Sequence, residues 1–280
     1  MPHRRTTSRW ALALMVAGLC APAPAAATWS IVVVDARTGR IVVSSATCVS
    51  QTSIKRFPAK GLRDLQAIVV PGVGAAVAQA GLDRSGRNQS LIYRELRKGT
   101  APEQILEMLD KDPGIDNRQF GFVDRKGRTL AFSGLANVQV AAARTGRIRG
   151  TDVYYAVQGN ILASRAVVDD AVRALALTDG TLEDRVMAAM EAADRAGGDR
   201  RCSCRTRPFV AAPCTTRHAQ VAYLLASDPT DAEGRTFSDG AYRMVIEVTD
   251  ENIRAHEDAN PVRTLRMRYD AAVRTEGDGG

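Results

Sequence analysis

The stretch Ala25-Ala26-Ala27-Thr28-Trp29-Ser30-Ile31 joins two segments of different character. Upstream of it, three arginines in the first nine residues precede an apolar run that ends at Cys20 and is too short to span a bilayer. Ala25 and Ala27 are small residues at the two positions that a signal peptidase reads. Residues 1–27 are therefore predicted to be a signal peptide, and Thr28 to be the first residue of the mature chain.

Downstream of this junction the chain is rich in strand formers. Residues 28–34 read Thr-Trp-Ser-Ile-Val-Val-Val, and residues 41–45 read Ile-Val-Val-Ser-Ser. The six residues between them contain Gly39, which can adopt the positive φ that a tight turn needs. The pattern predicts a β-hairpin whose first strand begins at Thr28.

The remaining pattern alternates between groups of strands and pairs of helices. Strands are expected at 67–70, 73–80, 119–124, 129–132, 153–157, 220–226 and 241–248. Helices are expected at 91–96, 102–109, 167–175 and 182–190, while 47–60 is polar and irregular. Thr100 with Glu103 has the spacing of a helix capping box. Strands in hairpins and helices in pairs favour an α+β fold, with two sheets face to face and helices outside.

Length and composition limit the classes of protein to consider. Of 280 residues, about 253 remain after the signal, enough for one domain at 28–227 and a C-terminal extension at 228–280 that packs on it. The mature chain keeps 35 basic and 31 acidic side chains, and aromatic residues make up 5%. These values do not favour nucleic-acid binding. No apolar run after residue 27 reaches membrane-spanning length, so no stable membrane insertion is expected. A lipid anchor at Cys20 would need a small residue before it, where Leu19 stands.

Export determines how the remaining cysteines are interpreted. Cys48, Cys202, Cys204 and Cys214 follow the signal, and four cysteines allow three pairings. A bond between Cys202 and Cys204 would strain a very short loop, so we expect Cys48 to join one of that pair and Cys214 the other. The alternative is a metal site formed by Cys202, Cys204 and Cys214 with His218, but it lacks the usual Cys-x-x-Cys spacing.

A free amino-terminal threonine carries a hydroxyl and an amine on one residue. The amine has an unperturbed pKa of about 7.7–8.0 and can take the hydroxyl proton during attack on a carbonyl. The sequence contains no Gly-x-Ser-x-Gly elbow, no His-Glu-x-x-His motif and no phosphate-binding loop after Gly74. We therefore expect no cofactor and no metal. The alternative is that Thr28 is first only because every exported chain begins somewhere.

Several segments together resemble the bacterial domain-of-unknown-function 1028 family, which is grouped with the amino-terminal-nucleophile (Ntn) hydrolases. They are the mature start, residues 74–79 (Gly-Ala-Ala-Val-Ala-Gln), 157–162 (Val-Gln-Gly-Asn-Ile-Leu) and 197–200 (Gly-Gly-Asp-Arg). The resemblance covers most of 28–227 and implies a four-layer αββα sandwich with threonine at the tip of an inner strand. The cysteine-bearing segment 202–214 interrupts it.

Four further residues are candidates for the site around Thr28. Asn160 follows a strand end and can donate its amide to an oxyanion, or else cap a loop. Asp199 can hold the Thr28 ammonium, or else serve as an ordinary turn aspartate. Gln79 and Ser45 are candidate substrate-binding residues, with strand-end contacts as the alternative. If there is an active site, at least two of Gln79, Asn160 and Asp199 should line one cleft with Thr28.

The sequence thus favours a periplasmic or secreted hydrolase of an amide or peptide-like bond, with a small amide- or peptide-like substrate. Thr28 is the expected nucleophile. The rival hypothesis is a non-catalytic binding or assembly protein on the same fold. A homo-oligomer is compatible with either.

Overall fold

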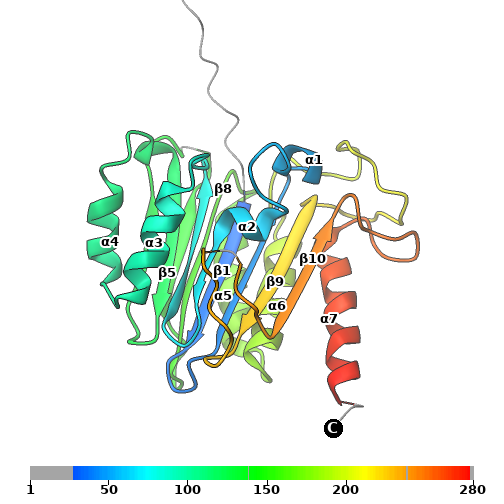
Figure 1. Ribbon diagram of the computed structural model, residues 1–280. Coiled ribbons are helices and arrows are strands. Elements are labelled where there is room, and N and C mark those ends of the chain that lie inside the picture. The colour runs from blue at the N-terminus through cyan, green and yellow to red at the C-terminus, as the bar shows by residue number, and fades with distance from the viewer. Residues whose placement is uncertain (1–27, 138, 238, 278–280) are drawn as a thin grey trace, which may run out of the picture.

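Two antiparallel β-sheets lie at the centre of the computed structural model, which describes residues 28–137, 139–237 and 239–277 (Figure 1). The predicted signal peptide, 1–27, lies outside these residues. The expected combination of helices with antiparallel strands is confirmed. Within the described ranges, no helix is long and apolar enough to cross a membrane.

The larger sheet has six strands in the order β10-β9-β2-β1-β8-β7. Its strands are β1 (Thr28–Asp35), β2 (Ile41–Thr47), β7 (Ala142–Arg147), β8 (Val153–Asn160), β9 (Val221–Ser227) and β10 (Met244–Thr249). The smaller sheet has the order β3-β4-β5-β6. Its strands are β3 (Ala67–Val70), β4 (Gly74–Ala80), β5 (Arg118–Asp124) and β6 (Thr129–Ser133). The β1–β2 hairpin is confirmed, and Gly39 in its turn has φ +77°.

Helices cover the outer faces of both sheets (Figure 1). The longer helices are α3 (Arg87–Arg97), α4 (Pro102–Leu109), α5 (Ala166–Leu177), α6 (Leu182–Arg195) and α7 (Pro261–Gly277). The short ones are α1 (Gln51–Ile54), α2 (Leu62–Gln66) and the 3-10 helix η1 (Ile115–Asn117). Helices α5, α6 and α7 contact the six-stranded sheet, whereas α3 and α4 contact the four-stranded sheet.

Three apolar cores follow from this arrangement. One lies between the six-stranded sheet and α5–α7, one between the two sheets, and one between the four-stranded sheet and α3–α4. Strand β1 serves two of them, because Ile31 and Val33 face the helices while Val32 and Val34 face the second sheet. A strand buried on both faces reads as a continuous apolar run, which explains Ile-Val-Val-Val at 31–34.

The side chains that β1 places between the two sheets change from apolar to polar along the strand. Valines fill it toward the hairpin turn, but the same face carries Thr28 and Ser30 at the beginning of the strand. The neighbouring strands place Thr47 and Gln158 there, also buried. Burying polar groups is costly unless they are hydrogen-bonded, so this end of the interface is the part that packing alone does not explain.

Several local predictions need correction. The polar stretch 47–60 contains the short helix α1, because the Ser50 hydroxyl accepts the backbone N–H of Ser53 and caps it. Helix α4 is capped one residue later than its sequence indicates, with Gln104 accepting the N–H of Ala101. The Thr100 hydroxyl instead donates to Glu95. Strand β7 was not predicted from the sequence.

The segment 228–280 packs on the domain through both of its elements. Strand β10 pairs with β9 as the edge of the six-stranded sheet, and α7 contacts β9 and β10. Val262, Leu265 and Tyr269 of α7 are buried in the core beneath the helices. Helix α7 is thus a full structural element whose apolar side chains belong to the core.

Two disulfides join the cysteines in the expected manner. Cys48 is bonded to Cys202, and Cys204 to Cys214. The alternative metal site is therefore wrong, because these sulfur atoms are bonded to each other and are not thiolate ligands. Disulfides are typical of proteins outside the reducing cytoplasm.

The two disulfides should differ in their contribution to stability. The Cys48–Cys202 bond closes a loop of 154 residues and the Cys204–Cys214 bond a loop of 10. Loop-closure entropy predicts about 5 kcal/mol for the first and about 3 kcal/mol for the second. We expect the double variant Cys48→Ser/Cys202→Ser to lose more unfolding free energy than Cys204→Ser/Cys214→Ser, as measured by urea denaturation. Equal losses would show that loop length does not govern the stabilisation.

Candidate functional site

Thr28 lies between two strands that hold both of its reactive groups. In the register of the sheet, Thr47 of β2 and Asn160 of β8 flank it. The backbone nitrogen of Thr28 donates to Asn160 Oδ1 over 3.2 Å. Its hydroxyl donates to Thr47 Oγ1 over 3.3 Å. All three side chains are buried, so the position of the Thr28 hydroxyl is set by the sheet rather than by solvent.

Glutamines of the second sheet hold the same end of β1. Gln79 of β4 donates from Nε2 to the carbonyl oxygen of Thr28 over 3.3 Å and to Gln119 Oε1 over 2.6 Å. Gln119 of β5 in turn donates to the carbonyl oxygen of Gly159 over 3.1 Å. A Cβ on Gly159 would lie 2.8 Å from that Thr28 oxygen, so the close approach requires glycine. The two sheets are thus connected by hydrogen bonds at Thr28.

The side-chain amide of Asn160 uses its oxygen in a hydrogen bond, whereas its nitrogen is unpaired among the described residues. Its oxygen accepts from Thr28, but its Nδ2 is buried and has no hydrogen-bond partner in the described part of the chain. A carboxamide nitrogen carries two N–H donors, and leaving a buried donor unpaired costs about 1–3 kcal/mol. An oxyanion-stabilising group needs an unused donor, and this one lies on the amide that accepts from the Thr28 nitrogen.

Asp199 binds the residue that follows Thr47 and does not contact Thr28 itself. Its carboxylate accepts the backbone N–H of Cys48 over 2.9 Å and pairs with Arg201 over 2.8 Å. None of its hydrogen bonds in the described chain goes to Thr28. Gly198, with φ +42°, precedes it, and a Cβ there would lie 2.7 Å from the Trp29 ring. Asp199 therefore anchors the chain directly after Thr47 instead of binding the Thr28 nitrogen.

Ser45 lies on β2 and donates its hydroxyl to the carbonyl oxygen of Trp29 over 2.8 Å. This bond adds a side-chain contact to the β1–β2 ladder next to Thr28. Its geometry is that of a strand-positioning contact, and a substrate-binding role for Ser45 stays a prediction.

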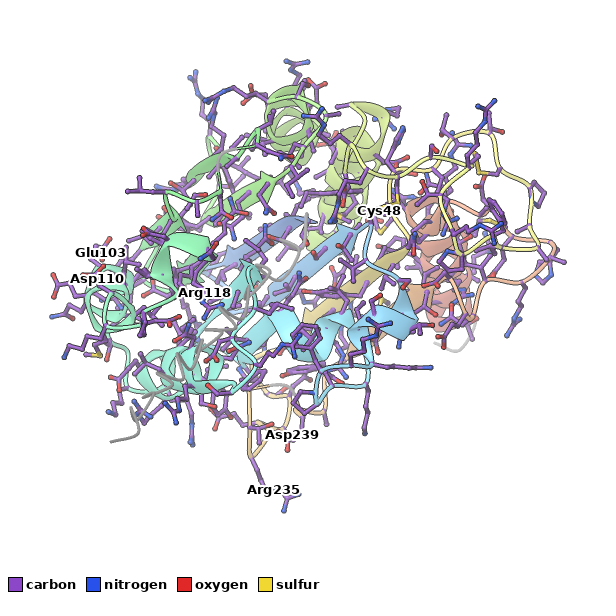
Figure 2. The ribbon with its side chains drawn as sticks, turned by 90° about the horizontal axis from the view of Figure 1, so that it is seen from above. Cys48, Glu103, Asp110, Arg118, Arg235 and Asp239 are labelled. Carbon is purple, nitrogen blue, oxygen red and sulfur yellow. A yellow bond between two sulfur atoms is a disulfide. The ribbon has the colours of Figure 1, made fainter. Side chains whose placement is uncertain are left out.

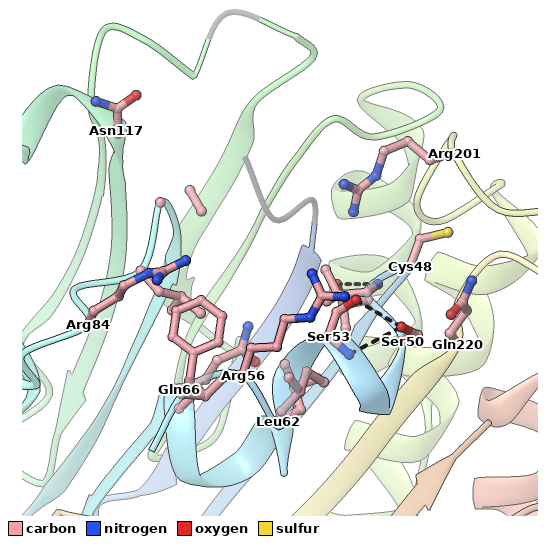
Figure 3. Close-up of a pocket in the computed structure, with 18 of the residues that line it drawn as sticks. Cys48, Ser50, Ser53, Arg56, Leu62, Gln66, Arg84, Asn117, Arg201 and Gln220 are labelled. Atoms are coloured by element: carbon pink, nitrogen blue, oxygen red, sulfur yellow. Dashed lines mark hydrogen bonds between the residues drawn. The ribbon is translucent and has the colours of Figure 1, made fainter. Parts of the chain in front are cut away.

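A cavity of about 750 Å³ approaches this cluster from the surface. Its wall includes Thr47 and Cys48, so the Thr28 hydroxyl lies one hydrogen bond behind the wall. Seen from above, Cys48 at the end of β2 and Arg118 at the start of β5 lie on either side of the place where the two sheets meet (Figure 2). Both residues line the cavity, and Figure 3 shows the side chains around it.

Two of the predicted residues contact Thr28, but the expected shared cleft is not found, because none of Thr28, Gln79, Asn160 and Asp199 lines this cavity. Gln79 and Asn160 contact Thr28 directly, but inside the protein, whereas Thr47 and Cys48 form the cavity wall. Sequence reasoning missed Thr47, although the hairpin places it opposite Thr28 once β2 is extended by two residues. It also missed Gln119, whose partner Gln79 is remote in sequence.

The fold and site together define a two-sheet protein with a threonine-centred polar cluster at the start of an inner strand. The chain belongs to a family of unknown function, DUF1028, whose model matches residues 28–212. A crystal structure of the DUF1028 protein SPO2555 from Silicibacter pomeroyi is similar, with TM-score 0.61 and 21% identity over 88% of this chain and 89% of that one. No curated protein matches. The likeness to SPO2555 shows the shared fold.

The Asp199–Arg201 ion pair should contribute more to the unfolding free energy than a solvent-exposed ion pair does. Asp199 is fully buried, so Asp199→Asn removes a charge-assisted bond to Arg201 and should cost about 1.5–3 kcal/mol of unfolding free energy. The matched control is Asp152→Asn, whose bond to Arg147 joins side chains 50% and 52% exposed and should cost at most about 1 kcal/mol. Chemical denaturation measures both. Similar costs would contradict the anchoring role of Asp199.

Proposed function

We propose that this chain is an exported hydrolase of an amide or peptide-like bond, with Thr28 as an amino-terminal nucleophile. The proposal includes removal of residues 1–27, a periplasmic or secreted location and membership of the Ntn superfamily. The succession of helices, sheet, sheet and helices supports the αββα sandwich of that superfamily. The family model also begins its match at Thr28.

One observation carries the proposal. The nitrogen and the hydroxyl of Thr28 are each held by a side chain from a neighbouring strand, and the unused Asn160 Nδ2 lies on the same amide as the acceptor of the Thr28 nitrogen. A structural strand end does not require this combination. A nucleophile, its base and an oxyanion donor do.

The chemistry follows from these groups. The freed amine of Thr28 takes the proton of its own hydroxyl as Oγ1 attacks the substrate carbonyl carbon. Asn160 Nδ2 donates to the oxyanion of the tetrahedral intermediate. The intermediate collapses to an ester on Oγ1, and the ammonium returns its proton to the leaving amine. Water, deprotonated by the same amine, then attacks the ester, and the ammonium passes this proton to Oγ1 as the acid is released.

A non-catalytic binding or assembly protein is the second candidate. The observation in its favour is that Thr28 is fully buried and that Thr47, not Thr28, forms the cavity wall. On this alternative, the polar cluster fixes the two sheets to each other, and the cavity binds a ligand without turnover.

Three forms of the protein separate the candidates: the precursor, the form beginning at Thr28, and its Thr28→Ala variant. Inside a peptide bond the Thr28 nitrogen is not basic, so only the second form should be labelled by an acylating probe such as an alkyne-tagged β-lactone. Peptide mass mapping should place the label on Thr28, and Thr28→Ser should keep part of the reactivity. Equal labelling of the precursor or of Thr28→Ala would refute the mechanism, and no labelling of any form by several probes would favour the binding protein.

Replacing the proposed oxyanion donor tests its role. Asn160→Asp keeps an oxygen acceptor for the Thr28 nitrogen but removes the N–H donors and adds a negative charge. We expect the labelling rate of the form beginning at Thr28 to fall about 10²–10³-fold. The circular dichroism spectrum checks that the variant is folded. An unchanged rate would rule out Asn160 as the donor.

A further inference from the structure

The cavity next to Thr28 carries charge of one sign. Among the residues that the structure describes, its lining includes five arginines and no aspartate or glutamate. The arginines are Arg56, Arg84, Arg118, Arg201 and Arg207. They come from different parts of the chain: the α1–α2 connection, the loop after β4, the first residue of β5 and the cysteine-bearing segment. The concentration of positive charge is therefore a property of the fold rather than of one basic run in the sequence.

Carboxylates behind the wall neutralise two of these arginines. Arg118 pairs with Asp112 over 2.7 Å, and Arg201 pairs with Asp199 over 2.8 Å. Burial opposes ionisation of Asp112, but the hydrogen bonds from Arg118 and the Gly114 N–H prevail and lower its pKa to about 2. The Arg118 pair is therefore fully charged at neutral pH.

Three arginines keep their charge uncompensated. Arg56, Arg84 and Arg207 form no ion pair with any residue in the described ranges. Arg84 lies over the Phe57 ring with its Cζ 5.1 Å from the centroid, and Arg207 lies in the same way over Phe209. Stacking on a ring fixes a guanidinium without using its N–H donors. Figure 3 shows Arg56, Arg84 and Arg201 directed toward one space.

The base of the same cavity is apolar. Ile54, Leu62 and Leu65 line it and are buried. Thr47, the hydrogen-bond partner of Thr28, belongs to the same wall. A ligand that fits this cavity has an apolar body and an anionic group, and Thr47 in the wall separates that body from the Thr28 hydroxyl.

From these observations we infer that the substrate is an amide that also carries a carboxylate, which Arg56 and Arg84 bind while the scissile bond lies toward Thr28. This inference rests on the proposed hydrolase function. Arginine matches the planar geometry of a carboxylate with two parallel N–H donors, and a cleft lined by one sign of charge concentrates counter-ions. A carboxylate is the anion that peptides and acyl amino acids carry.

The turnover experiment uses three anilides of similar length. They are the mono-4-nitroanilide of glutaric acid (anionic), its methyl ester (neutral) and the 4-nitroanilide of 5-aminopentanoic acid (cationic). Hydrolysis adds one water and releases 4-nitroaniline, which is measured by its absorbance. With the full-length gene product processed to Thr28, we expect kcat/KM to be about tenfold or more higher for the anion than for the ester, and lowest for the cation.

Two substitutions test whether the cavity arginines cause the preference for the anionic anilide. Arg56→Gln and Arg84→Gln should each reduce the preference for the anion over the ester by about tenfold, and added salt should reduce it in the unmodified protein. The matched control is Arg274→Gln, which removes one positive charge from the exposed end of α7. It should leave the preference unchanged. An equal effect of Arg274→Gln would assign the preference to net charge and overturn the inference.

A binding measurement separates this inference from the proposed function. In the Thr28→Ala variant, calorimetry with the intact glutaric anilide and its ester needs no turnover, and the anion should bind about tenfold more tightly. Equal affinities, or no binding of either, would overturn the carboxylate site even if Thr28 labels normally. The anion could bind more tightly while the unmodified protein fails to hydrolyse it. That result would support the carboxylate site and would overturn the proposed hydrolase function.

Discussion

The antiparallel pairing of β1 between β2 and β8 is the constraint on which the rest of this structure depends. It places Thr28 level with Thr47 on one side and Asn160 on the other. A register shift of one residue would turn every side chain of β1 to the opposite face and exchange Thr28 for Trp29. The valines between the sheets and Trp29 beneath the helices make such a shift costly, because both faces of β1 are buried. Apolar packing therefore sets the position of the polar end.

That polar end contrasts with ordinary sheet packing. Beyond Thr28, the buried Ser30 hydroxyl, the Gln158 amide and the Tyr223 hydroxyl have no hydrogen-bond partner in the described residues. Burial raises the pKa of Tyr223, which keeps it neutral. A purely structural interface between sheets would use apolar side chains at such positions. Places where local rules are broken while the rest of the core obeys them are where function is expected.

Much of this could be read from sequence, because the signals are local. The runs of strand-forming residues at 28–34 and 41–45 with a glycine-containing turn predict the hairpin, and loop strain restricts the pairing of the cysteines. Strand β7 gives no such signal, since Ala-Ala-Arg-Thr-Gly-Arg is an edge strand that pairs only with β8 and is largely solvated. The shifted cap of α4 was missed because Thr100 finds a tertiary partner in Glu95.

The site shows the same division between local and tertiary information. Thr28, Asn160, Gln79 and Asp199 are recognisable beside glycines or a strand end, but their mutual contacts depend on the pairing of distant strands. Asp199 had two candidate roles, binding the Thr28 nitrogen or serving as a turn aspartate, and its carboxylate in fact accepts the N–H of Cys48. The cavity arginines were missed altogether, because their neighbourhood exists only after the two sheets pack. The modest positive net charge of the chain, +7 over all 280 residues, does not indicate where the arginines gather.

The Cys48–Cys202 bond has a consequence for the order in which the molecule is assembled. Its partners are 154 residues apart, and the chain is synthesised from its amino terminus. The hairpin that contains Thr28 exists early, but its covalent closure waits until the smaller sheet, β8, α5 and α6 have all been made. The residue after Thr47 therefore gains its covalent link only after Cys202 has been synthesised. A chain that stops short of Cys202 cannot form this bond, so the end of β2 is then held beside Thr28 only by its non-covalent pairing with β1.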